Sequence, residues 1–371
     1  MNFGENAAPN LYLRRDHANV IAVFEMFVNT LFMEGNRTMK SIFKTALLCA
    51  TVLFAVAVSA SASVFDEHKK DFDYDKSMPL NPDIKVVQES AYFTKYLVHF
   101  DSVKGNRIPA FLYIPKDVRK YRDSLDPATL QGYNKRYIEL DGPPWPVIFF
   151  MHWLQSDKSF ADNFAGKWAT YGYALLAIDG VWKGERAKPG RSILETNITD
   201  TRDNIIQQVI DCRRGADYLE TRKDIDINRL TYFGISMGSL TGAITTAVDD
   251  RFKVVVLADG AGDFNTVFSK ADLPEFKKTV EEIKAKGFTL EQSMQILKPV
   301  DPIEYVGHIS PRPLLMINGK KDEIFPYEAM DEFHKAANEP MEVKWYNCGH
   351  ILPVPDTIML TLHWFKHYLT K

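Results

Sequence analysis

The feature that most constrains the fold of this chain is the pentad Gly-Ile-Ser-Met-Gly at positions 234–238. The apolar run Leu230–Phe233 precedes it, and the small-residue stretch Ser239–Val248, which favours a helix, follows. A G-x-S-x-G pentad between a buried strand and a helix predicts a sharp turn that leaves the serine hydroxyl exposed at the strand end. Backbone N–H groups at the helix start favour an anion that develops beside the serine. The pattern therefore predicts that Ser236 is a nucleophile.

An acid and a base follow this serine in the chain. Asp322 comes just after the apolar run Pro313–Gly319, and His350 lies before the last expected helix, roughly Asp356–Leu369. A serine hydroxyl is a weak nucleophile until a neighbouring base accepts its proton, and a neutral imidazole suits this role near neutral pH. A carboxylate fixes the imidazole tautomer and stabilises the imidazolium that forms. The sequence therefore predicts His350 as the base and Asp322 as the acid.

Two other carboxylates are alternatives for the acid. Glu323 is adjacent to Asp322, but neighbouring side chains on an extended loop point apart, so only one of the two can reach the histidine. Asp259 follows the apolar run Val254–Leu257, which is a second expected strand. The spacing after the preceding strand favours Asp322, and Asp259 is the weaker alternative.

The order Ser236, Asp322, His350 on alternating strands and helices resembles the α/β-hydrolase superfamily, and more narrowly its dienelactone-hydrolase and prolyl-oligopeptidase-like esterases. The resemblance covers roughly Val98–Lys371. It implies a mostly parallel central sheet with helices on both faces, and an acyl-enzyme mechanism on small-molecule or glycan esters. Serine peptidases and thioesterases share this fold, as do non-catalytic binding domains, and these are the alternatives.

The resemblance also assigns an oxyanion hole. The run Trp145–His152 is similar to the strand that leads into the oxyanion loop of these proteins, and by position the N–H groups of Leu154 and Met237 are the expected donors. Trp153 stands where the family usually has glycine, so the tryptophan is strained if that position requires a positive φ. His152 itself is expected to be structural.

Candidate pocket residues come from two loops. The run Tyr173–Asp179, followed by 180–186, resembles the family's Asp-x-x-Gly-x-Gly segment without its first glycine. The candidate substrate contacts are Trp153, Trp182 and Arg186. For Arg186, an ion pair that fixes the loop is favoured over a substrate contact.

The segment 263–308 separates two expected strands and contains two expected helices, Leu273–Lys286 and Leu290–Leu297. Thr289 with Gln292 matches the pattern of a capping box. The segment is either a small helical cap over the strand ends or an elaborated crossover connection, and both interpretations remain open. The cap interpretation predicts three pocket phenylalanines, Phe264, Phe268 and Phe276.

The periodicity of apolar residues predicts further strands, loops and a helix. Ser90–Ser102 and Arg107–Ile114 alternate like a pair of strands, and Ser63–Asp83 is expected to be a loose lead-in. Residues 115–142 are expected to be a surface insertion. Apolar residues recur at helical spacing at Ile205, Val209, Cys212, Ala216 and Leu219. Cys212 is therefore expected in the core, and a bridge to Cys348 is not expected.

The first part of the chain predicts export. A basic start at Met39–Lys44, the apolar run Thr45–Val58 and the small residues 59–62 form a signal peptide, cleaved after Ala62. The apolar run is short for a membrane span, which needs about 20 residues. Residues 1–38 are expected to result from a start codon assigned too far upstream. Met39 is then the true initiator. The mature chain, 63–371, is expected to be one hydrolase domain, periplasmic or secreted, without a membrane span.

Charge and motifs argue against other partners. The formal net charge is −3 and no basic stripe is present, so a nucleic-acid partner is not expected. The G-x-G-x-x-G and Walker patterns are absent, so no nucleotide cofactor is expected. His363 and His367 are one helical turn apart, but Trp364 stands where a zinc-protease helix needs glutamate, so no metal is expected.

Overall fold

The computed structural model describes residues 63–117, 142–270 and 274–369. The expected upstream start and signal peptide lie outside the described residues, as does most of the expected insertion at 115–142. The described strands are β1 (Asp83–Glu89), β2 (Phe93–Asp101), β3 (Arg107–Pro115), β4 (Trp145–Met151), β5 (Ala174–Ile178), β6 (Ile225–Ile235), β7 (Val254–Ala258), β8 (Leu314–Gly319) and β9 (Met341–Tyr346).

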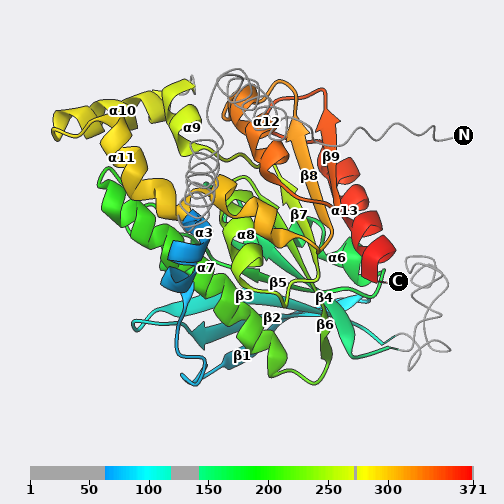
Figure 1. Cartoon of the computed structure of the whole chain (residues 1–371). Coiled ribbons are helices and arrows are strands. Elements are labelled where there is room, and N and C mark those ends of the chain that lie inside the picture. The colour runs from blue at the N-terminus through cyan, green and yellow to red at the C-terminus, as the bar shows by residue number, and fades with distance from the viewer. Residues whose placement is uncertain (1–62, 118–141, 271–273, 370–371) are drawn as a thin grey trace, which may run out of the picture. The chain divides into compact units, whose positions relative to one another are not determined.

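Within the described residues these nine strands form one sheet, in the order β1-β2-β3-β5-β4-β6-β7-β8-β9 (Figure 1). The strands β1, β2, β3 and β5 pair antiparallel in turn, whereas β5, β4, β6, β7, β8 and β9 pair in parallel. Strands β4, β5, β7 and β8 are buried along their whole length, as is usual for parallel strands covered on both faces. The predicted mostly parallel sheet is confirmed.

The described α-helices are α3 (Val64–His68), α6 (Ala165–Ala169), α7 (Ile198–Glu220), α8 (Met237–Val248), α9 (Phe264–Lys270), α10 (Pro274–Ala285), α11 (Leu290–Leu297), α12 (Tyr327–Ala336) and α13 (Val354–Leu369). The short 3₁₀ helices are η1 (Lys69–Phe72), η4 (Lys158–Asn163), η5 (Gly184–Arg186), η6 (Lys298–Val300), η7 (Pro302–Glu304) and η8 (Val306–Ile309). Most of the predicted helices are present, with ends that differ by a few residues.

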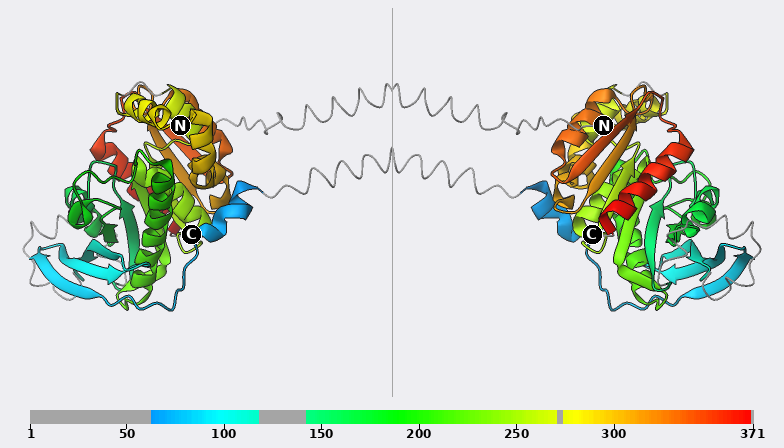
Figure 2. Two further views of the ribbon diagram at one scale, coloured as in Figure 1. Left: turned by 90° about the vertical axis from the view of Figure 1, so that its left-hand side faces the viewer. Right: turned by 90° about the vertical axis from the view of Figure 1, so that its right-hand side faces the viewer.

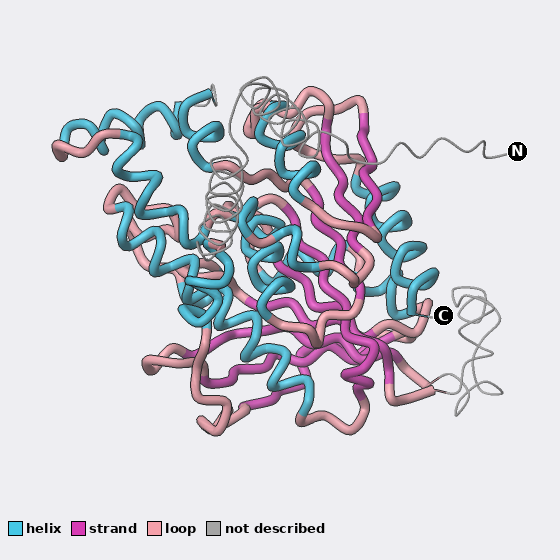
Figure 3. Tube along the Cα trace, viewed as in Figure 1, coloured by secondary structure: helices cyan, strands magenta, loops and turns pink. Residues whose placement is uncertain are grey.

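Helices cover both faces of the sheet because successive side chains of a strand point to opposite sides. Phe149 of β4 packs in one core with Cys212 of α7 and Ala243 of α8. The next residue, Phe150, packs in the opposite core with Trp168 of α6 and residues of α13. Figure 2 and Figure 3 show these helices on the two sides of the strands. The expected core position of Cys212 is confirmed.

The lead-in is more ordered than predicted. The expected loose stretch Ser63–Asp83 begins with α3 and η1, and Phe72 at the end of η1 is fully buried beside Tyr305. The carbonyl of Phe72 also accepts a hydrogen bond from the Arg213 side chain. The prediction failed because separate aromatic residues, Phe65, Phe72 and Tyr74, anchor an otherwise polar segment without a periodic pattern.

The two helices predicted in 263–308 are present as α10 and α11. The capping box at the start of α11 is confirmed, with Gln292 N donating to Thr289 Oγ1 and the Gln292 side chain accepting from Thr289 N. The structure adds α9, whose Phe264, Val267 and Phe268 are buried in one cluster with α8. Helices α9 and α11 therefore pack in one cluster with the helix that follows the pentad.

Two further observations bear on the expectations. Cys212 and Cys348 are both free thiols. Among the described residues, the structure contains no helix with the length and apolar character needed to cross a membrane.

Candidate functional site

Ser236 occupies the turn between β6 and α8. Its backbone has φ 53° and ψ −112°, a conformation that a serine adopts only under constraint from its surroundings. Ser236 N donates to the Ala258 carbonyl at the end of β7 (2.8 Å), and the Ser236 carbonyl accepts from Ser239 N and Leu240 N. These bonds hold the strained turn at the strand end.

The two glycines of the pentad are required by close approach of backbone segments. A Cβ on Gly238 would lie 2.2 Å from the Met151 carbonyl oxygen, and one on Gly234 would lie 2.2 Å from the Gly238 oxygen. Neither glycine has a positive φ. The start of α8 is thereby packed directly against the end of β4, where the loop 152–155 begins.

Gly238→Ala is expected to lower the free energy of unfolding by about 3 kcal/mol, because the added methyl group meets backbone atoms that cannot move independently. It should also lower any Ser236-dependent turnover by about 100-fold, since a shift near 1 Å in the reacting groups has that effect. Urea unfolding and steady-state kinetics measure both. The control is Gly166→Ala in α6, where the new Cβ makes only a 3.4 Å contact with a phenylalanine ring. Equal effects of the two variants would contradict the assignment.

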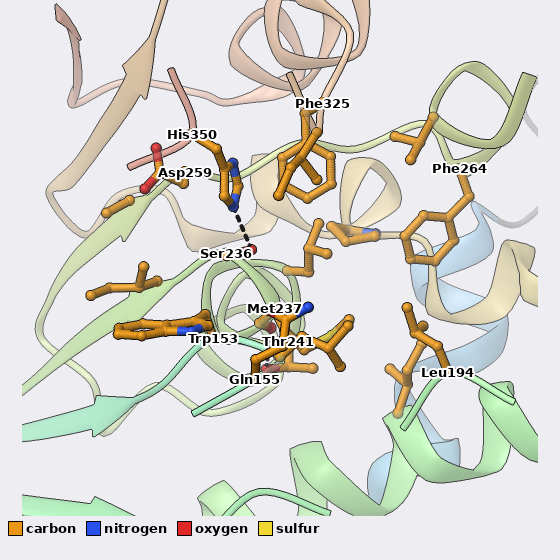
Figure 4. Close-up of a pocket in the computed structure, with 18 of the residues that line it drawn as sticks. Trp153, Gln155, Leu194, Ser236, Met237, Thr241, Asp259, Phe264, Phe325 and His350 are labelled. Carbon is orange, nitrogen blue, oxygen red and sulfur yellow. Dashed lines mark hydrogen bonds between the residues drawn. The ribbon is translucent and has the colours of Figure 1, made fainter. Parts of the chain in front are cut away.

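The side chains of Ser236, His350 and Asp322 form a continuous hydrogen-bonded chain. Figure 4 shows the bond between His350 and Ser236. His350 Nε2 lies 2.9 Å from Ser236 Oγ, and His350 Nδ1 lies 2.8 Å from Asp322 Oδ2. The carboxylate of Asp322 can only accept a hydrogen bond, so Nδ1 carries the proton and Nε2 is left free to accept from the serine hydroxyl. The structure thus brings together the three residues predicted as nucleophile, base and acid.

The loop before α12 fixes Asp322. Its Oδ1 accepts from Ile324 N (2.7 Å) and Phe325 N (2.8 Å), and its side chain is fully buried. Glu323, the neighbouring alternative, accepts instead from the backbone N–H of His350 (3.0 Å). The two carboxylates point apart as predicted, and Glu323 orients the histidine backbone while Asp322 contacts the imidazole.

Asp259, the other alternative acid, lies beside this chain but in a different state. It is 2% exposed, its backbone φ is 50°, and its Oδ1 has no hydrogen-bond partner among the described residues. Burial, together with the charges of Asp322 and Glu323, raises its pKa to about 9. Asp259 is therefore neutral near pH 7, when Asp322 is the carboxylate bonded to His350.

Asp259→Asn is expected to stabilise the protein at alkaline pH. Between the unfolded pKa of 3.8 and the folded pKa of about 9, the native state holds a proton that the unfolded state has lost. Native stability thus falls as pH rises, by up to about 1.4 kcal/mol per pH unit, and the variant lacks this loss. Urea unfolding at pH 5 and pH 8 measures the difference.

The matched control for this prediction is Asp249→Asn. Asp249 is also buried, but its pKa is lowered by hydrogen bonds and charges from Arg251 and Arg213, although burial opposes this. The stability that ionised Asp249 contributes is lost only as pH falls through its lowered pKa. Asp249→Asn should therefore lower the free energy of unfolding by the same amount at pH 5 and pH 8. A constant difference between the Asp259→Asn variant and the wild type over this range would show that Asp259 is already ionised at pH 5.

The same three side chains contain the atom types of a metal site. Among the described residues, Asp259, Asp322 and His350 each place one ligand-type atom within 4.8 Å of the others. The Asp322 and His350 atoms are engaged with each other, and the hydrogen-bonded chain to Ser236 accounts for the positions of these two side chains.

The predicted oxyanion donors both lie at the pocket that contains Ser236. Leu154 and Met237 are lining residues, and Figure 4 places Met237 directly beside the serine. Met237 is the first residue of α8, so its N–H has no acceptor within the helix. Trp153 does not have a positive φ, so the expected strain is absent, and its ring packs edge-on against Phe160.

His152 holds the start of this loop in place. Its Nδ1 donates to the Trp153 carbonyl (2.7 Å), and its Nε2 accepts from Gly180 N (3.0 Å). Burial lowers the pKa of the imidazole, which favours the neutral form that this donor-acceptor pair requires. His152 therefore joins the loops that follow β4 and β5, and the structural role expected for it fits these contacts.

The pocket beside Ser236 has a volume of about 690 Å³, and of the three candidate contacts only Trp153 lines it. Trp182 lies outside, with Nε1 donating to Asn204 Oδ1 (3.1 Å). Arg186 forms an ion pair with the fully buried Asp211 (2.8 Å) and donates to the Asp179 carbonyl. The assignment of Trp182 and Arg186 to the pocket is thus corrected, because a buried charge such as Asp211 needs a counter-ion.

Two of the three predicted phenylalanines line the pocket. Phe264 and Phe268 do so as the cap interpretation predicts, while the side chain of Phe276 lies outside the described part of the chain. Apolar residues of α7 and α8 complete the wall, and Phe325 lies over the histidine. Their helical periodicity is visible in the sequence, but that pattern does not distinguish a pocket wall from a filled core.

Residues 169–369, which are more than half of the chain, match the prolyl oligopeptidase family. "Putative hydrolase YtaP" of Bacillus subtilis (strain 168) is 27% identical over 206 residues, which are 52% of this chain and 65% of that protein. "Putative esterase YitV" of the same organism is 24% identical over 234 residues, which are 60% of this chain and 89% of that protein. The chain thus spans just under two thirds of the first relative's length.

Solved structures share the fold. An acetyl xylan esterase from Paenibacillus sp. R4 aligns with a TM-score of 0.65 and 21% identity, over 82% of this chain and 93% of that chain. Acetyl Xylan Esterase 1 from Thermoanaerobacterium sp. JW/SL YS485 also aligns with a TM-score of 0.65, at 17% identity, over 81% of this chain and 92% of that chain. At these identities the likeness establishes the fold alone.

Proposed function

Because the chain belongs to the prolyl oligopeptidase family, whose members are serine hydrolases of α/β-hydrolase fold, we propose that it cleaves carboxylic esters through an acyl-enzyme on Ser236. The observation that carries the proposal is the hydrogen-bonded chain from Ser236 Oγ through His350 to Asp322, at 2.9 and 2.8 Å. The names of an esterase relative and of two solved acetyl xylan esterases support esters as the substrate class.

In the proposed reaction, Ser236 Oγ attacks the ester carbonyl while its proton moves to His350 Nε2. The N–H groups of Leu154 and Met237 stabilise the negative charge on the carbonyl oxygen, a contribution of about 100- to 1000-fold per donor. His350 then gives its proton to the alcohol oxygen as the carbon–oxygen bond breaks, and Asp322 stabilises the transient imidazolium. Water, activated by His350, repeats the sequence and releases the acid.

The test is covalent labelling of the purified protein with a fluorophosphonate, read by peptide mass spectrometry. An adduct on Ser236, absent from Ser236→Ala, would support an activated serine. Ser239→Ala is the matched control, because Ser239 is a buried serine of the same helix whose hydroxyl has no partner among the described residues. A folded wild-type protein that forms no adduct would overturn the proposal.

We also propose that the protein is exported after cleavage behind Ala62, and that acyl groups on sugars are among its substrates. The signal-peptide pattern of residues 39–62 supports the first statement, and the names of the two solved acetyl xylan esterases support the second. The test is the intact mass of the protein expressed from its native gene, which shows at which residue the chain begins. A mass that begins at Ser63 is expected, and a mass that includes residues before Met39 would overturn both the cleavage and the start site.

A further inference from the structure

The pocket beside Ser236 extends to both sides of the serine. In Figure 4, Trp153 lies on one side, whereas Leu194 and Phe264 lie on the other, away from His350. The second side is formed by α7, α8, α9 and the loop before α7, and we name it the inner chamber. It is defined here by Leu194, Ile205, Leu240, Ile244, Phe264 and Val267.

The inner chamber has a buried, apolar wall. Of its six defining residues, all but Leu194 are between 0% and 7% exposed, so this wall belongs to the packed interior. The walls come from three helices that are packed together in one cluster. An apolar substrate group that entered this space would lose contact with water over most of its surface.

Polar side chains near the chamber are already hydrogen-bonded within the protein. Thr241 Oγ1 donates to the Met237 carbonyl (3.0 Å), and Thr201 Oγ1 donates to the Glu195 carbonyl (3.0 Å) and accepts from Glu195 N. The Glu195 carboxylate accepts from Arg191 Nε (2.8 Å). A hydroxyl-rich group would lose its bonds to water without matching partners here, and that loss disfavours binding.

The opposite side of the pocket is open to solvent. Ile351, next to the catalytic histidine, is 82% exposed, and Val354 at the start of α13 is 42% exposed, yet both line the pocket. In an acyl-enzyme mechanism the alcohol leaves first, while the acyl group is still bonded to Ser236. The alcohol therefore needs the open side, and the group that stays belongs against the buried wall of the inner chamber.

We propose that the inner chamber binds the acyl part of the substrate, and that this acyl group is apolar and much larger than acetyl, such as a medium-length alkyl or an aromatic acyl group. This inference rests on the proposed ester hydrolysis at Ser236. Pockets of roughly 300–1000 Å³ enclose drug-sized ligands, and the whole pocket, at about 690 Å³, has room for such a group and an alcohol. An acetyl group would fill only a small part of this volume.

The test compares two ester series on the wild-type protein. The first series keeps p-nitrophenol as the alcohol and lengthens the acyl group from acetate through butyrate to octanoate. The second keeps acetate and lengthens the alcohol. Each buried methylene can raise kcat/KM up to about fourfold, so we expect octanoate to exceed acetate at least tenfold. A wild-type enzyme that prefers acetate, or that responds to alcohol length and ignores acyl length, would overturn the proposal.

Two matched variants locate the effect. Val267→Phe adds the same bulk inside the chamber that Val354→Phe adds at the open side, and both residues line the pocket. We expect Val267→Phe to lower the octanoate-to-acetate ratio of kcat/KM at least tenfold, and Val354→Phe to change this ratio less than threefold. Leu194→Phe, at a half-buried loop position, repeats the test if Val267→Phe does not fold. Equal changes of the ratio in the chamber and at the open side would contradict the assignment.

Failure of this inference is distinguishable from failure of the proposed function. If the protein hydrolyses acetate in a Ser236-dependent way without a gain for longer acyl groups, only the chamber assignment is wrong. If no ester is hydrolysed in a Ser236-dependent way and no fluorophosphonate adduct forms, the ester hydrolysis itself is wrong, and the chamber assignment falls with it.

Discussion

Ser236→Ala is expected to lower kcat for ester hydrolysis about a million-fold, an effect as large as that of losing the whole triad. The variant removes the atom that attacks the carbonyl, while the histidine and the oxyanion donors stay in place. A residual rate of about 10³- to 10⁴-fold over water should remain, because the oxyanion hole and substrate binding still act. Active-site titration must exclude contaminating wild-type enzyme before such a rate is measured.

The reasoning has a further consequence for the double variant. Residues that act as one unit are not additive, so Ser236→Ala combined with His350→Ala should be no slower than Ser236→Ala alone. Ser239→Ala, in the same helix, is expected to change kcat less than threefold, because its hydroxyl has no partner among the described residues. A double variant that is slower by the product of the single effects would mean that His350 acts independently of the serine.

Asp322→Asn is expected to lower kcat about 10⁴-fold with little change in the fold. Asp322 Oδ1 accepts from two backbone N–H groups, so the single carbonyl oxygen of an asparagine is held there. The amide NH₂ then faces His350 Nδ1, which must become an acceptor, and Nε2 carries the proton. A protonated Nε2 cannot accept from Ser236, and steady-state kinetics with circular dichroism would measure the loss in a folded protein.

The control for Asp322→Asn is Glu323→Gln, one residue along the same loop. Glu323 accepts from the backbone N–H of His350, and a glutamine oxygen can accept the same bond. We expect less than a tenfold loss, which would separate the carboxylate on the imidazole from the one on the backbone. If Glu323→Gln caused the larger loss, the roles of the two acids would have to be exchanged.

The central sheet could be predicted because its parallel strands are continuous apolar runs. Strand β4 was expected at 145–152 and is found at 145–151, where every residue is buried. Strand β1 was missed for the opposite reason, since all of its residues are exposed at the edge of the sheet and show no alternation. Helix α12 was also missed. Its ten residues directly follow the loop that carries Asp322, and their amphipathic pattern is short.

The candidate triad could be predicted because its three residues each follow a strand, and the spacing to the strand separates Asp322 from Glu323. The state of Asp259 could not be predicted. Its pKa rises because it is buried and because it lies near two carboxylates from a loop more than sixty positions later in the chain. The contacts of Arg186 were equally hidden, since its partner Asp211 sits in the middle of a long helix.

The long separation between Ser236 and His350 along the chain makes assembly of the triad a late step in the expected order of folding. The two residues are 114 positions apart, and the loop that carries the histidine lies between β9, at the edge of the sheet, and α13. Contacts between distant positions form slowly, because the chain entropy of closing a long loop must first be overcome. A refolding chain can thus complete strands β2 to β7 and still hydrolyse nothing. Recovery of activity should lag behind recovery of secondary structure, and it would report the moment at which the last strand and its loop dock.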